Sequence, residues 1–133
     1  IKPQNPFGRL VDTLRWHCKE FSLIGSIDCK LLGSCNDELL GKDVQLDIFR
    51  ICQEALHNVL YHSEATIASI TINETITELS FAIVDNGKGF DVTKIENSNG
   101  LTVMKERAAS INASLTVSSK PGSGTEVILT LKK

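Results

Sequence analysis

The chain has 133 residues, of which 41% are hydrophobic and 23% charged, and its formal net charge is −2. This composition is typical of one globular domain with a real core, and the small charge gives no electrostatic case for nucleic acid or an anionic membrane surface. No apolar run approaches the roughly 20 residues that cross a bilayer, and no signal peptide opens the sequence. We therefore expect a cytoplasmic single domain, residues 1–133, cut from a longer protein.

The first half of the chain predicts two helices and one strand. Residues 7–22 carry apolar side chains on one helical face, and residues 26–32 alternate as a strand does. Residues 33–41 form a polar connection. A long helix is predicted over residues 43–62, and its many apolar positions indicate that much of it is buried.

The second half is richer in strands. Residues 66–74 and 77–85 are predicted to pair as a hairpin, and the polar residues 91–99 are predicted to form a mobile loop. A helix is expected over residues 100–111. Strands over residues 114–119 and 125–131 close the chain.

Hairpins of strands set beside segregated helices favour an α+β two-layer sandwich, with a mixed, mostly antiparallel sheet covered on one face by helices. Four cysteines, Cys18, Cys29, Cys35 and Cys52, lack the C-x-x-C spacing of a zinc site. We interpret them as reduced cysteines that act as small apolar residues.

A polar line marks the long helix, because Glu54, Asn58 and His62 follow one another at i, i+4 and i+8. Such a line can be no more than the wet face of an amphipathic helix. Asparagine is a mediocre helix former, however, and an oxygen ligand for a hard cation such as magnesium would explain its place.

The segment Asp-Asn-Gly-Lys-Gly-Phe at residues 85–90 ends the second strand of the hairpin. Strand parity places Asp85 on the same face as the apolar Phe81 and Ile83, so its carboxylate points toward the buried side. A buried acid needs a donor, and a ligand N–H group could be that donor. The simpler interpretation is an ordinary strand-ending turn.

Two further clusters are weak when taken singly. Asn99, Gly100 and Leu101 open a helix whose backbone N–H groups could bind an anion, although Asn99 could be only a helix cap. Residues 121–125, Pro-Gly-Ser-Gly-Thr, could be only a hairpin loop. The standard phosphate motifs G-x-x-x-x-G-K-[ST] and G-x-G-x-x-G are absent from the sequence.

Together and in this order, the four clusters resemble the N, G1, G2 and closing Gly-Thr boxes of the GHKL (Bergerat-fold) ATPases. The forms R-I-x-Q-E-A-L-x-N at residues 50–58 and G-L-x-x-M-x-E-R-A at residues 100–108 are most similar to the catalytic domain of two-component sensor histidine kinases. Within these, the resemblance is to the branch of the nitrate, nitrite and degradation sensors.

The resemblance implies Mg-ATP as ligand and transfer of its γ-phosphoryl group to a histidine on a separate dimerisation domain. It implies that Asp85 accepts the adenine amino group, with Gly87 and Gly89 letting the chain pass the base and Thr125 in support. His62, Gly100 and Leu101 would lie at the phosphates, under a lid at residues 91–99. Asn58 would hold magnesium, and the catalytic residues would be Glu54 and Asn58.

The family pattern also predicts the partners: a dimerisation domain, a response-regulator receiver domain and a homodimeric parent whose membrane anchoring is left open. Ser98 stands where the family usually has a glycine, and none of His17, His57 and His62 precedes an acid, as an acceptor histidine does in this branch. Two alternatives remain: an anti-sigma-factor-type serine kinase, and a pseudokinase module that binds nucleotide without catalysis.

Overall fold

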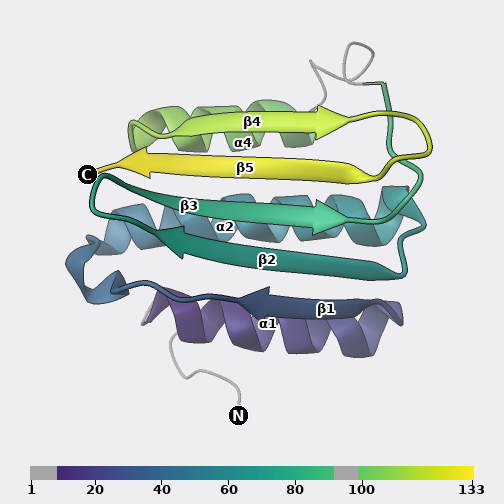
Figure 1. The fold of residues 1–133 in the computed structure, drawn as a ribbon, viewed down its shortest axis with the longest axis horizontal. Helices are drawn as coiled ribbons and strands as arrows, with labels where there is room; N and C mark the ends of the chain where they lie inside the picture. Colours follow the sequence, from purple (N-terminus) through teal and green to yellow (C-terminus); the bar gives the residue numbers. More distant parts are fainter. Residues whose placement is uncertain (1–8, 92–98) are drawn as a thin grey trace.

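The computed structural model describes residues 9–91 and 99–133, which build a sheet layer and a helix layer (Figure 1). The elements in chain order are α1 Leu10–Gly25, β1 Asp28–Leu32, the 3₁₀ turn η1 Asp37–Leu39, α2 Lys42–Asn58, the π-helical turn η2 Val59–Ser63, β2 Ile67–Glu74, β3 Glu78–Asp85, α4 Asn99–Ser110, β4 Ser114–Ser119 and β5 Thr125–Lys132.

The five strands lie in the order β1-β2-β3-β5-β4. Only β1 and β2 pair in parallel, and the other neighbours are antiparallel. The helices α1, α2 and α4 all lie behind the same face of this sheet in Figure 1. The predicted α+β sandwich with a mixed, mostly antiparallel sheet is therefore confirmed, as is the predicted hairpin of β2 and β3.

The core fills the space between the two layers. Helix α1 contributes Leu14 and helix α2 contributes Ile51, and both are fully buried. They meet inward-facing strand residues that are equally buried, such as Ile70, Phe81 and Leu129. Buried residues alternate strictly with exposed or half-buried ones along β3, which explains why sequence periodicity could locate this strand.

The structure departs from the predicted elements at two places. The helix expected over residues 43–62 keeps α-helical hydrogen bonding only to Asn58 and continues as the π turn η2. The polar connection at residues 33–41 holds η1, in which buried Asp37 accepts a 2.8 Å hydrogen bond from the backbone N–H of Val11 at the start of α1. Of the predicted mobile loop, residues 92–98 lie outside the described part of the chain.

The cysteines and His17 lie within or beside the packed core. All four cysteines are free thiols, and three of them are buried. His17 packs its ring edge-on against Phe49, with ring centroids 5.5 Å apart, between α1 and α2. Burial lowers the pKa of this histidine, with Glu20 opposing the shift.

Candidate functional site

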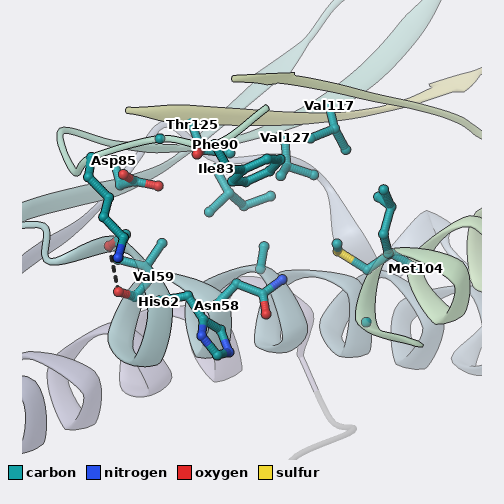
Figure 2. Close-up of a pocket in the computed structure, with 16 residues that line it drawn as sticks. Asn58, Val59, His62, Ile83, Asp85, Phe90, Met104, Val117, Thr125 and Val127 are labelled. Carbon is teal, nitrogen blue, oxygen red and sulfur yellow. Dashed lines mark hydrogen bonds between the residues drawn. The ribbon is translucent and has the colours of Figure 1, made fainter. Parts of the chain in front are cut away.

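A cavity of about 410 Å³ opens between the sheet and the helices α2 and α4. Figure 2 shows Asp85 and Thr125 at the sheet wall, Asn58 and His62 on the helix that faces it, and Met104 at the side. The lining residues are Ala55, Asn58, Val59, His62, Ser63, Ile83, Asp85, Lys88, Gly89, Phe90, Gly100, Leu101, Met104, Val117, Thr125 and Val127. The structure thus gathers residues from all four sequence clusters around one space.

Asp85 is the acidic group of the sheet wall. It is only 8% exposed, and its Oδ1 accepts a 2.8 Å hydrogen bond from the backbone N–H of Gly87. Burial raises the pKa of Asp85 above its ordinary value, while hydrogen bonds from the backbone N–H groups of Gly87 and Thr125 pull it down. The carboxylate lies beside the cavity, as its strand parity predicted, and can accept a hydrogen bond from a ligand there.

The π turn η2 positions the helical wall. In such a turn the hydrogen bonds run from i to i+5, so Asn58 and His62 no longer stack as a straight i, i+4 line, yet both line the cavity. Ser63 ends the turn with its hydroxyl donating to the carbonyl of Val59. Its own carbonyl accepts a 2.7 Å hydrogen bond from the N–H of Lys88, which ties the turn to the segment after β3.

The two glycines of this segment, Gly87 and Gly89, pack closely against backbone carbonyl groups of neighbouring segments. A Cβ on Gly87 would come within 2.3 Å of the Ser63 carbonyl oxygen. Gly89 has a φ of +65°, and its Cβ would come within 2.1 Å of the Lys120 carbonyl oxygen. Gly89 lines the cavity and Gly87 does not, so direct passage of the chain along a base stays a prediction for both.

The start of α4 closes the far side of the cavity. Gly100 and Leu101 both line it, and their binding of phosphate stays a prediction. A Cβ on Gly100 would lie 3.1 Å from Glu54 Oε1, so the glycine lets α4 approach that carboxylate. Glu54 does not line the cavity itself and lies 3.7 Å from His57 Nδ1, which leaves its catalytic role a prediction.

Sequence reasoning missed the apolar walls and one cation. The walls come from Ala55, Val59, Ile83, Phe90, Met104, Val117 and Val127, and they form a slot suited to a flat ring. Strand parity had already placed Ile83 on the face of Asp85, and the same parity could have found Val127, two residues from Thr125. Lys88 lines the mouth with its Nζ 4.0 Å from Glu64 Oε2, and no spacing rule indicated it.

Residues 43–133 match the model of the histidine kinase-, DNA gyrase B- and HSP90-like ATPase family. The chain belongs to this ATPase family. The predicted resemblance is therefore confirmed, and as a member of this family the domain binds ATP. The cavity lies wholly within the matched residues, between elements that the family model covers.

Relatives similar in sequence are sensor kinases. The chain is 38% identical over 125 residues to the signal transduction histidine-protein kinase/phosphatase DegS of Brevibacillus brevis, covering 92% of this chain and 32% of DegS. It is 39% identical over 92 residues to the sensor histidine kinase LiaS of Bacillus subtilis, covering 68% of this chain and 26% of LiaS. The chain thus spans about a third or less of these relatives, and the domain is of the type found in sensor histidine kinases.

Solved structures share the fold. The histidine kinase domain of a blue-light activated kinase from Erythrobacter litoralis superposes with a TM-score of 0.79 at 19% identity, over 92% of this chain and 60% of that one. The ATP binding domain of PrrB from Mycobacterium tuberculosis superposes at 0.74 and 18% identity, over 93% of each chain. None of the helices formed by the described residues has the length and apolar character needed to span a membrane.

Proposed function

We propose that this ATPase-family domain is the catalytic part of a sensor histidine kinase and transfers the γ-phosphoryl group of Mg-ATP to a histidine on a separate dimerisation domain. The observation that carries the proposal is the opposition of Asp85 on the sheet wall to Asn58 and the start of α4 across one cavity. This arrangement suits a nucleotide whose base enters the apolar slot and whose phosphates lie between the two helices.

In this proposal, hydrogen bonding and apolar packing together hold the adenine ring. The carboxylate of Asp85 accepts from the exocyclic amino group, and the slot between Ile83, Val127 and Met104 covers the faces of the ring. The phosphates are proposed to lie at the first turn of α4, where Gly100 and Leu101 line the cavity near the positive end of the helix dipole.

Magnesium is the cation that the oxygen donor at the cavity would suit. Asn58 supplies one side-chain oxygen at the cavity. That fits magnesium, which keeps several waters and takes one or two protein ligands plus phosphate oxygens. When bound, the ion neutralises phosphate charge during transfer.

Phosphoryl transfer depends mostly on positioning and charge neutralisation. In this proposal Glu54 orients the attacking imidazole from its place against Gly100, and His62 lies near the phosphates. The acceptor histidine and the response-regulator aspartate that receives the group next belong to other domains. The parent protein is proposed to be a homodimer, since the acceptor lies on a dimerisation domain.

The test is a transfer assay with γ-labelled ATP on the chain fused to the dimerisation domain of its own parent. The proposal predicts acid-labile label on the dimerisation domain, together with loss of that label but not of ADP binding in Glu54→Gln. Nucleotide binding without any label on the fusion would contradict the transfer reaction and favour a nucleotide-binding module without catalysis.

A further inference from the structure

A row of three polar side chains crosses the sheet wall at the cavity. Asp85 pairs with Thr125 in the register of β3 with β5, and Thr125 pairs with Ser119 in the register of β5 with β4. Directly opposed residues of antiparallel strands point to the same face, so all three side chains lie on the helix-covered face. Ser119 does not line the cavity, but its neighbour Thr125 does.

The hydroxyl of Ser119 has three partners and one proton. Its Oγ accepts a 2.9 Å hydrogen bond from the N–H of Phe90 and donates a 3.0 Å hydrogen bond to the carbonyl of Gly124. It also lies 2.9 Å from Thr125 Oγ1. Because the carbonyl can only accept, the Ser119 proton satisfies it, and the hydrogen bond between the two hydroxyls must use the proton of Thr125.

We propose that Ser119 is a positioning residue whose Oγ accepts a hydrogen bond from the hydroxyl of Thr125, so that Thr125 Oγ1 can act only as an acceptor toward the ligand. This inference rests on the proposed nucleotide site and adds to it a determinant of base specificity. The Thr125 oxygen then stands beside the carboxylate of Asp85, and the two present an edge of acceptors to the ligand.

An edge of acceptors discriminates at the 6-position of a purine. A 6-amino group donates to it, whereas a 6-oxo group meets oxygens that cannot donate, and a site built for hydrogen bonding rejects an unmatched group strongly. Without Ser119, the Thr125 hydroxyl is released to rotate and can donate to a 6-oxo group. Ser119 therefore sharpens the preference for adenine without touching the base.

The experiment compares the dissociation constants of ADP and inosine diphosphate by calorimetry, since the two nucleotides differ at the 6-position and the adjacent ring nitrogen. The wild-type chain is expected to prefer ADP. Ser119→Ala is expected to reduce the ratio of the two constants by about 3- to 10-fold, the range of one hydrogen bond. Ser118→Ala is the matched control, because Ser118 is exposed on the opposite face of the same strand.

A double-mutant cycle separates this role from simple structural support. Thr125→Val removes the oriented oxygen, so adding Ser119→Ala to it should change the ratio no further. Ser119→Thr keeps the hydroxyl and should keep the wild-type ratio, which covers the case in which the alanine variant does not fold.

Each result has a definite meaning. A wild-type preference that Ser119→Ala leaves unchanged, or lowers equally in the Thr125→Val background, overturns the positioning role and leaves the nucleotide site standing. A wild-type chain that binds neither nucleotide overturns the proposed function, and this inference with it.

Discussion

At the scale of single residues, Asp85 is an acid buried beside the cavity, where its charge is costly for the fold and is proposed to serve nucleotide binding. Its carboxylate is nearly buried, and the two backbone N–H groups that reach it offset only part of the burial. We expect Asp85→Asn to weaken ADP binding by about 1.5–3 kcal/mol, because a charge-assisted hydrogen bond in a buried site is lost. Calorimetry with ADP measures this loss, and an unchanged dissociation constant would remove Asp85 from the adenine site.

The same substitution should not weaken the fold. Because the folded-state pKa of Asp85 is raised, its contribution to stability is complete below the unfolded pKa and is lost as the pH rises through the folded pKa. We therefore expect Asp85→Asn to be at least as stable as the wild type at neutral pH, with the difference vanishing below about pH 4. Urea unfolding at several pH values checks this, and an advantage of the variant that grows on acidification would contradict it.

Asn58 is the proposed magnesium ligand, so its substitution should separate metal binding from nucleotide binding. In that role its side-chain oxygen binds a cation that otherwise keeps its waters. Asn58→Ala should reduce ADP affinity in the presence of magnesium more than in its absence. Titrations in magnesium and in EDTA give the two values, and equal losses would assign Asn58 a structural role.

At the level of elements, the sequence predicted the helices and strands whose apolar residues repeat with a regular helical or strand period. The alternation along β3 located the strand and the inward direction of Asp85 together. The end of α2 was predicted wrongly, because nothing in the apolar spacing of Val59 and Leu60 distinguishes a π turn from an α-helix. What sets the turn is tertiary: the Ser63 carbonyl bonds to Lys88, which is 25 residues away.

The contact between η2 and the segment after β3 should depend on Gly87. A side chain there would meet the Ser63 carbonyl at 2.3 Å, a backbone atom that cannot move aside alone. Gly87→Ala should cost about 1–3 kcal/mol in the free energy of unfolding and weaken ADP binding as well. Gly41→Ala is the control, since a Cβ at Gly41 would meet nothing within 4 Å. Equal, small effects of both substitutions in urea unfolding would show that the two segments do not need this contact.

At the level of the whole molecule, the predicted fold class is confirmed. The four sequence clusters come together around one cavity, because all the helices cover the same face of the sheet. The apolar lining was missed, since core and slot residues look alike in sequence. Met104, for example, is 2% exposed and also lines the cavity. The roles of Glu54, Asn58 and His62 stay predictions.

The isolated chain should bind ATP and yet label itself poorly. None of His17, His57 and His62 is followed by an acid, as the acceptor histidine of this branch is, and His17 also packs its ring against Phe49. An acid-labile phosphate assay should give little signal on the chain alone, more with the dimerisation domain added and most when it is fused. Robust label on the chain alone that His17→Gln abolishes would show that His17 is an acceptor.

The most direct test of the central claim is to map the binding of a non-hydrolysable ATP analogue with magnesium onto the backbone amides by NMR. The account predicts that the largest shifts fall on Asp85, Gly89, Gly100, Leu101 and Thr125, which line the cavity between the sheet and the helices α2 and α4. Shifts confined to other surfaces, such as the shallow cleft at Asp43 and Asn112, or no shifts at saturating analogue, would contradict it.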